Sequence, residues 1–241
     1  MTARRARKGR ITAGELLAEL EQDPAYIARQ AEREIRQQEA RREYALAAAP
    51  VLAELAETGF PVETIGELYG TPLYYEPVIP ILLRWLPRME NLRVKSDIVR
   101  ALSVKWAKPI AAPVLIQEYR RVPTFPASDM RWTVGNALSV VADDSVFNEI
   151  VELVRDRQHG KAREMVALAL ANMKNPRAVD VLIELLDDEE VAGHALMALR
   201  KLAPPRARSY IERFVNHPTT WIRNEAKRAL AKIDKKTAKE T

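Results

Sequence analysis

The apolar positions of this chain repeat in one helical pattern between residues 94 and 233. In the copy that begins at Ile222, apolar residues fall at i, i+4, i+7, i+8 and i+11. Positions with this spacing share one stripe of an α-helix. Each copy holds an Ala-Leu pair, whose alanines are Ala101, Ala137, Ala169, Ala198 and Ala229. Because successive alanines are 36, 32, 29 and 31 residues apart, the pattern predicts a helical repeat.

A second set of amphipathic helices is predicted ahead of these copies. Prolines stand near the expected helix starts, at Pro77, Pro109, Pro176 and Pro205. A proline is tolerated there because its missing N–H would be unpaired in the first turn anyway. Neither helix of a unit can bury its apolar stripe alone, so we expect the units to stack into one continuous core. The small alanines should lie where paired helices approach closely.

The first seventy residues predict helices outside this pattern. Asp23 is a suitable cap for a long helix over Ala25–Ala49, rich in strong helix formers. A new helix is predicted from Pro50 to a stop at Gly59, followed by a short helix over Pro61–Tyr69. We expect these last two helices to cover the open end of the first repeat.

The predicted helices and repeats divide the chain into four segments. Residues 1–10 are expected to be a disordered basic leader, and residues 11–72 an N-terminal helical extension with a cap for the array. Residues 73–234 are the repeats, and residues 235–241 are expected to be a disordered tail.

The repeated units resemble HEAT repeats of the short bacterial type. They are about thirty residues long, and most open their second helix with an apolar residue followed by a basic one. The matching pairs are Val94-Lys95, Met130-Arg131, Ala162-Arg163 and Ile222-Arg223, whereas Val191-Ala192 departs from the pattern. The resemblance covers residues 75–233. It implies an all-α fold, a right-handed α-solenoid of about five HEAT-like two-helix repeats with an N-terminal helical extension.

The resemblance also implies a role for the basic residue of each pair. In HEAT repeats it pairs with an acid of the preceding turn, and these pairs form a ladder between units. Asp129 and Asp156 fit that position here, and the run Asp187–Glu190 supplies carboxylates beside the unit that lacks its arginine.

The net charge of +5 is concentrated at the N-terminus. Residues 1–10 carry five basic side chains and no acid, so the remainder of the chain is balanced; the five are Arg4, Arg5, Arg7, Lys8 and Arg10. They are candidate phosphate contacts, or alternatively a solubilising leader. We therefore expect nucleic-acid binding, if present, to be weak and to depend on this segment.

Several classes of chemistry lack their residues in this sequence. The chain has no cysteine, which excludes disulfides and thiolate sites. The histidines His159, His194 and His217 share no ligand spacing, and no glycine-rich phosphate loop occurs among eight glycines. We predict no catalytic residue, no metal and no cofactor. No apolar run is long enough for a membrane span, and the expected compartment is the cytoplasm.

Two functions remain compatible with this sequence. The first is a non-enzymatic interaction scaffold or adaptor that presents a concave helical surface to a protein partner. The alternative is a HEAT-like DNA-binding or alkylpurine DNA glycosylase-type protein, suggested by Trp85, Trp106, Trp132 and Trp221. Against the alternative, Trp85 falls on a core stripe and the body of the chain is not basic.

The predicted binding surface is the face of each second helix opposite its apolar stripe. In a HEAT-like solenoid this face lines the concave side. The candidate residues are Arg100, Trp132, Asn136, Leu168, Met197, Arg200 and Arg228, with small residues such as Gly193 among them. Trp132 lies off its own core stripe, which is typical of an anchor for a partner. The competing explanation is that another part of the chain covers it.

Overall fold

The computed structural model describes residues 12–123 and 128–240. Contacts divide the chain into two compact units, unit 1 up to Ala47 and unit 2 from Ala48 onward. Every regular element of the described part is a helix. The all-α fold predicted from the sequence is therefore confirmed.

Unit 1 consists of α1 (Ala13–Leu20) and the first part of α2 (Pro24–Glu57). Asp23 caps α2 as predicted, because its Oδ1 accepts a hydrogen bond from the backbone N–H of Ala25 at 2.9 Å. The exposed large apolar residues of this unit are Leu16, Leu17, Ile27, Ile35 and Leu46.

Helix α2 does not end before Pro50, so the prediction of two separate helices is wrong. Proline removes one backbone hydrogen bond from a helix, but the residues on either side of Pro50 hold the helical geometry. Ala48, Val51 and Leu55 are fully buried in unit 2 and must share one helical stripe to pack there. Gly59 ends the helix as predicted, with φ of 88° and with the N–H of Phe60 donating to Leu55 O at 2.9 Å.

The short helix expected over Pro61–Tyr69 is confined to α3 (Gly66–Gly70). Its late start has a local cause. The Glu67 carboxylate accepts hydrogen bonds from the backbone N–H of Thr64 at 3.0 Å and of Glu63 at 3.3 Å. These bonds satisfy donors that would otherwise need a preceding helical turn.

Unit 2 continues as five pairs of helices, each with a first and a second member. The first helices are α4 (Ile79–Trp85), α6 (Ala111–Arg121), α8 (Phe147–Arg155), α10 (Arg177–Glu184) and α12 (Arg208–Glu212). The second helices are α5 (Leu92–Ala101), α7 (Ser128–Val141), α9 (Arg163–Ala169), α11 (Ala192–Leu202) and α13 (Thr220–Glu240). Single 3₁₀ turns flank most of them. Helix α13 includes residues 235–240, for which the sequence predicts a disordered tail.

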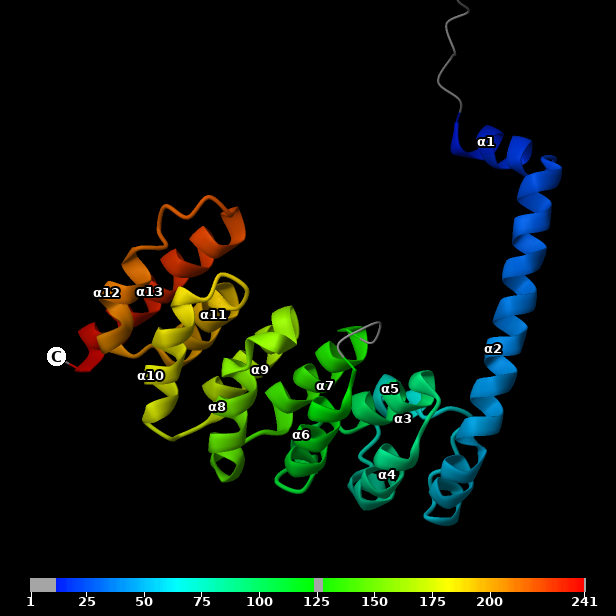
Figure 1. Ribbon diagram of the computed structural model, residues 1–241, viewed down its shortest axis with the longest axis horizontal. Helices are drawn as coiled ribbons and strands as arrows, with labels where there is room; N and C mark the ends of the chain where they lie inside the picture. Colours follow the sequence, from blue (N-terminus) through cyan, green and yellow to red (C-terminus); the bar gives the residue numbers. More distant parts are fainter. Residues whose placement is uncertain (1–11, 124–127, 241) are drawn as a thin grey trace, which may run out of the picture. The chain divides into compact units, whose positions relative to one another are not determined.

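Successive second helices lie side by side, α5 against α7, α7 against α9, α9 against α11 and α11 against α13 (Figure 1). Four of the five repeating alanines are completely inaccessible to solvent, and Ala198 is 1% exposed. The predicted stacking of units around small alanines is confirmed, and the architecture is an α-solenoid.

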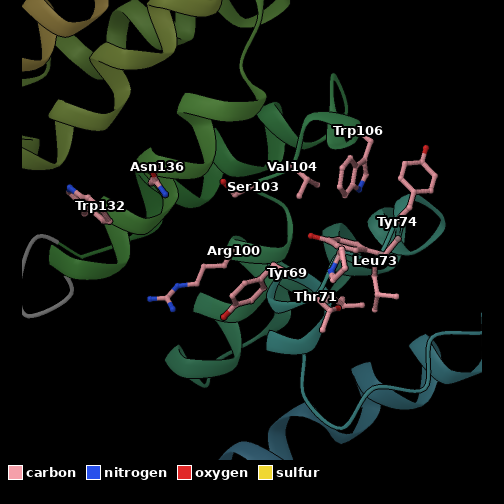
Figure 2. Close-up of a pocket in the computed structure, with 13 residues that line it drawn as sticks. Tyr69, Thr71, Leu73, Tyr74, Arg100, Ser103, Val104, Trp106, Trp132 and Asn136 are labelled. Atoms are coloured by element: carbon pink, nitrogen blue, oxygen red, sulfur yellow. The ribbon is translucent and has the colours of Figure 1, made fainter.

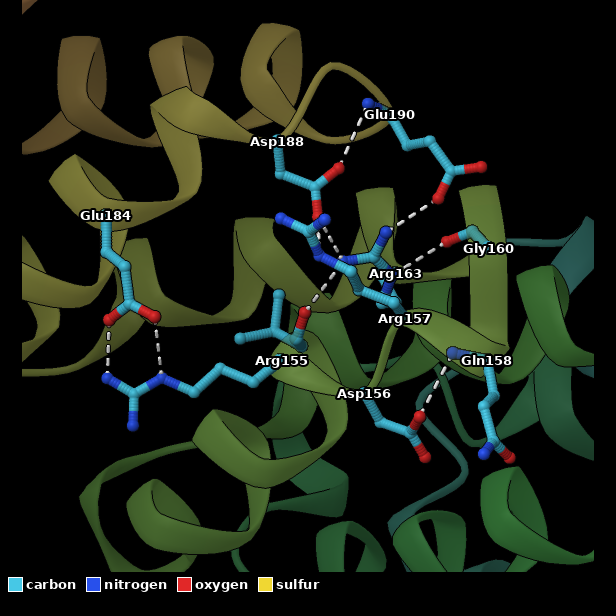
Figure 3. A network of polar contacts seen from close by, with 10 residues as sticks. Arg155, Asp156, Arg157, Gln158, Gly160, Arg163, Glu184, Asp188 and Glu190 are labelled. Carbon is cyan, nitrogen blue, oxygen red and sulfur yellow. Dashed lines mark hydrogen bonds and ion pairs between the residues drawn. The ribbon is translucent and has the colours of Figure 1, made fainter.

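Among the described residues, ion pairs between units form at two of the basic positions, Lys95 and Arg163. Lys95 Nζ lies 2.7 Å from Glu118 Oε1. Arg163 is 1% exposed and lies between Asp188 Oδ2 and Glu190 Oε2, each 2.7 Å from its guanidinium (Figure 3). These carboxylates belong to the turn before α11, the helix that lacks a basic residue of its own. Arg163 therefore bridges two units.

One detail of the predicted ladder is wrong. Asp156 does not pair with Arg163: it accepts from the backbone N–H of Gln158 at 3.0 Å, and its Oδ2 lies 3.3 Å from His159 Nε2. Arg131 is buried and donates to the backbone carbonyls of Tyr119 and Val122. The side chain of Asp129 lies outside the described part. The predicted pair of Asp129 with Arg131 therefore stays a prediction, whereas Asp156 interacts with groups within a few residues instead of with Arg163.

Candidate binding surface on the second helices

The exposed side of the second helices in unit 2 carries two hollows, and we call this side the second-helix face. The aromatic pocket lies where α3, the segment after it, α5 and α7 meet. The basic pocket lies over α7, α9, α11 and α13. Six of the seven residues predicted to bind a partner line one or the other.

The aromatic pocket has a volume of about 710 Å³. Its lining from the predicted set consists of Arg100, Trp132 and Asn136, and the remainder is Leu68, Tyr69, Thr71, Pro72, Leu73, Tyr74, Tyr75, Ser103, Val104 and Trp106. Figure 2 shows Trp132 and Asn136 at one end, Arg100 and Tyr69 in the middle, and Leu73, Tyr74 and Trp106 at the other end.

The aromatic side chains of this pocket are held by specific contacts. Trp106 packs against the rings of Tyr74 and Tyr75, with centroid separations of 5.2 and 5.5 Å. The Tyr75 hydroxyl donates to Ala101 O at 2.9 Å, and the Tyr69 hydroxyl donates to Asp97 Oδ1 at 2.8 Å. Burial raises the pKa of Tyr75 to about 12, with a smaller effect from Tyr69. Both phenols therefore stay protonated and act as donors at neutral pH.

The accessible part of the pocket is aromatic with one cation. Trp132 is 45% exposed and Tyr74 is 61% exposed. Arg100 is the charged residue of the lining and projects from α5 beside Tyr69 (Figure 2). Within the described residues of unit 2, the indole of Trp132 is therefore half exposed and not covered by a neighbouring first helix.

The basic pocket has a volume of about 330 Å³. Leu168, Met197 and Arg200 are its predicted members, and it also includes Ser139, Ala171, Asn172, Ala198, Lys201 and Lys232. Three cations thus line one small hollow, and the lining contains no carboxylate.

The remaining predicted residues lie elsewhere. Arg228 lines neither pocket, and its Nη1 is 3.7 Å from Oε2 of Glu225. Gly193 was expected on the open floor but is buried, because the indole of Trp221 covers it. The N-terminal cations Arg4, Arg5, Arg7, Lys8 and Arg10 lie outside the described residues.

Several lining residues were not among the predicted ones. Leu73, Tyr74 and Trp106 stand in non-repetitive segments, where helical periodicity gives no indication of the side on which they lie. The run Tyr69–Tyr75 is the one sequence signal that bears on them, because it combines three tyrosines with Gly70 and Pro72 and no helical pattern. Lys201 and Lys232 flank the predicted stripe on their helices instead of lying on it.

The histidines do not gather into a site. Nowhere in the described part of the chain do three or more His, Cys, Asp or Glu side chains meet in a manner that suits a metal ion. His159 packs edge-on against Tyr119, with centroids 5.1 Å apart. Burial and then the charge of Arg131 lower the pKa of His159, so it is neutral at pH 7.

The tryptophans are divided between interior and surface. The indole nitrogens of Trp85 and Trp106 are buried, whereas Trp132 and Trp221 are about half exposed. The four therefore do not form one surface of the kind that the DNA-glycosylase comparison requires.

Comparison with known proteins identifies the repeats. A family model described as HEAT repeats matches residues 112–192, from the start of α6 to the start of α11. Residues 112–192 are therefore HEAT repeats. The HEAT-repeat array lies within the stretch over which the helix pairs stack.

Two solved structures of designed proteins are similar to this chain at low sequence identity. The designed armadillo repeat protein YIII(Dq)4CqI is 15% identical with a TM-score of 0.43, and the match covers 70% of this chain and 91% of that one. The designed armadillo repeat protein YIII(Dq.V1)4CPAF, in complex with peptide (KR)4, is 14% identical with a TM-score of 0.47, covering 90% and 98%. No curated protein matches the chain. Across residues 12–123 and 128–240, no helix is both long enough and apolar enough to cross a bilayer.

Proposed function

We propose that this α-solenoid protein is a non-enzymatic scaffold that binds a segment of a partner protein on its second-helix face. The observation that carries the proposal is the aromatic pocket. It combines exposed Tyr74 and Trp132 with Arg100 around a hollow of about 710 Å³. Tyrosine, tryptophan and arginine are the residues most enriched where interfaces concentrate their binding energy.

The construction of the pocket supports a binding role. A hollow of this volume is within the range that holds a small ligand or a few side chains. Its walls are fixed, because Trp106 packs against two tyrosine rings and Tyr69 is hydrogen-bonded to Asp97. Rigid aromatic walls lose little conformational entropy when a partner binds.

The chemistry of the pocket describes the segment that would fit. An aromatic or aliphatic side chain would pack between Trp132 and Tyr69, where the walls are apolar. A carbonyl or carboxylate beside it would accept hydrogen bonds from Arg100 and Asn136, both of which are exposed. Trp132 is the anchor because its indole supplies the largest apolar area at this end.

The test begins with selection of peptides from a displayed random library on the intact protein. Dissociation constants of the selected peptides are then measured for the wild type, Trp132→Ala and Trp221→Ala. We expect Trp132→Ala to weaken binding by about 30-fold or more, the loss typical of a central aromatic contact. Its melting temperature should fall only slightly, since the side chain is half exposed.

Trp221→Ala is the matched control, because Trp221 is also a half-exposed tryptophan of a second helix but lines neither pocket. Equal losses for the two variants, or selected peptides that bind regardless of Trp132, would contradict the proposal.

A further inference from the structure

The basic pocket has donors that are not fully used within the protein. Lys201 Nζ donates to the side-chain oxygen of Asn172, and Lys232 Nζ donates to the backbone carbonyl of Lys201 at 3.0 Å. An ammonium group has three N–H donors, so each lysine is positioned by one bond and keeps others for a ligand. Both side chains are therefore held in place without being neutralised by these bonds.

Arg200 is the cation of this pocket that pairs with an acid. Its Nε donates to Oε1 of Glu225, whose side chain is 7% exposed. The same carboxylate lies 3.7 Å from Arg228. Two arginines thus share one buried carboxylate. Lys201 and Lys232 have no carboxylate beside them in the lining, so the exposed side of the basic pocket is positive.

The two pockets are connected along α7. Trp132, Asn136 and Ser139 are four and three residues apart and so share one stripe of that helix. Trp132 and Asn136 line the aromatic pocket, and Ser139 lines the basic pocket. Seven residues of helix cover about 10 Å, a distance that three to four residues of extended peptide can span.

From these observations we infer that the basic pocket is a second subsite, which binds the carboxylates of an acidic peptide segment anchored in the aromatic pocket. The inference rests on the proposed function and specifies the partner: an apolar or aromatic residue followed, a few residues away, by Asp or Glu side chains. Lys201 and Lys232 bind the carboxylates, and Leu168 and Met197 contact the aliphatic part of the segment.

The distribution of charge favours a peptide over a nucleic acid. A nucleic acid carries a phosphate at every nucleotide and needs cations along its whole path. Between the cations of the two pockets, the lining residues from α7, α9 and the 3₁₀ turn after α9 include Asn136, Ser139, Leu168, Ala171 and Asn172, all uncharged. Glu164, also on α9, places a carboxylate 3.9 Å from His194. Positive charge confined to one pocket suits a ligand with localised acid groups.

The test uses two fluorescein-labelled peptides of equal length, each with a tryptophan, a three-residue Gly-Ser spacer and then three glutamates or three glutamines. Fluorescence anisotropy measures their binding to the intact wild-type protein and to the double variant Lys201→Gln/Lys232→Gln. Glutamine keeps the hydrogen-bonding capacity of each position while removing the charge. The control is Lys227→Gln, which removes a cation from the opposite flank of α13.

We expect the glutamate peptide to bind the wild type at least 10-fold more tightly than the glutamine peptide. The double variant should lose that difference, Lys227→Gln should keep it, and added salt should reduce it. Unchanged circular dichroism and melting temperature would show that the double variant remains folded.

The possible failures are distinguishable. If both peptides bind equally and depend on Trp132, the inference about the basic pocket is wrong and the proposed function survives. If neither peptide binds but library-selected peptides bind through Trp132, the inference alone is wrong, and if no peptide of either kind binds, both are overturned. A single-stranded oligonucleotide that binds more tightly than the glutamate peptide, through the same two lysines, would overturn the inference in favour of a nucleic-acid ligand.

Discussion

The indole of Trp221 occupies the space in which a side chain at Gly193 would lie. A Cβ built on Gly193 would be 2.7 Å from Cζ2 and from Cζ3 of the indole, closer than any tolerated contact. The glycine therefore allows an aromatic ring of α13 to pack directly on the backbone of α11. This contact holds α11 and α13 against each other. The Trp221 ring also packs edge-on against His194 of α11, with centroids 5.8 Å apart.

The contact predicts that Gly193→Ala changes stability in opposite directions in the wild type and in a Trp221→Ala variant. In the wild type, Gly193→Ala should displace the Trp221 ring, lower stability by about 1–3 kcal/mol and shift the tryptophan emission toward longer wavelength. In a Trp221→Ala background, the same Gly193→Ala should be neutral or stabilising by up to about 1 kcal/mol, because alanine is the better helix former. Urea denaturation of the four proteins measures both values. Equal effects in the two backgrounds would show that the ring does not pack on Gly193.

The buried alanines predict that the core does not tolerate added volume. Ala198→Leu and Ala229→Leu place three extra carbons where the side chain is at most 1% exposed, so each should cost about 1–3 kcal/mol. Ala231→Leu is the control, since Ala231 is exposed on the same helix as Ala229. Thermal denaturation should show a lower melting temperature for the first two variants alone. An unchanged melting temperature in all three would contradict the repeat register.

The Arg163 network predicts unequal effects for two arginines that both form ion pairs between units. Arg163 also donates to Gly160 O at 3.0 Å and to Val154 O at 3.2 Å, so Arg163→Met removes a donor from two carboxylates and from two carbonyls. Its cost should lie between the roughly 1 kcal/mol of an exposed pair and the roughly 3–5 kcal/mol of a fully buried one.

The control for this prediction is Arg155→Met. Arg155 forms a two-bond pair with Glu184 at 3.1 and 2.6 Å, but its side chain is 50% exposed. This variant should lose at most about 1 kcal/mol in chemical denaturation. A larger loss of stability for Arg155→Met than for Arg163→Met would contradict the prediction that the buried network contributes more.

The same network predicts an acid-dependent part of the stability. Burial by itself raises the pKa of Asp188, but the hydrogen bond and charge of Arg163 lower it by more, so the net shift is downward. A lowered pKa in the folded state stabilises the protein above the unfolded value of about 3.9, and this contribution disappears as the pH falls through the folded value. The difference in stability between the wild type and Asp188→Asn should thus be constant above about pH 5 and shrink below about pH 4. Denaturation curves at several pH values measure it, and a difference that grows in acid would exclude this coupling.

The basic leader predicts where any nucleic-acid binding originates. The full chain should bind duplex DNA weakly and with a steep dependence on salt, because contacts to phosphate release counterions. A chain that starts at Ile11 should lose this binding. Anisotropy of a fluorescent duplex at two salt concentrations compares the two proteins. Tight binding that survives the truncation would instead support the DNA-binding alternative.

The periodic part of the fold could be read directly from the sequence. The Ala-Leu spacing places Ala101 and Ala229 in equivalent helices, because helical geometry fixes which residues share a stripe whatever lies around them. The same geometry places Trp132 and Asn136 away from the core. Local rules also identify Asp23 as a cap and Gly59 as a stop, since each acts on backbone groups within a few residues.

Features that depend on residues distant in the chain were decided only by the tertiary structure. Pro50 stays within α2 because burial of its neighbours outweighs one lost hydrogen bond. Gly193 is covered because Trp221 of the next unit packs on it. The pairing of Arg163 with Asp188, and the meeting of Lys201 with Lys232, join residues 25 and 31 positions apart. The sequence by itself determined which side of each helix faces the core. The contacts between exposed side chains of different helices depend on how successive helices pack. The sequence pattern of one helix does not specify that packing.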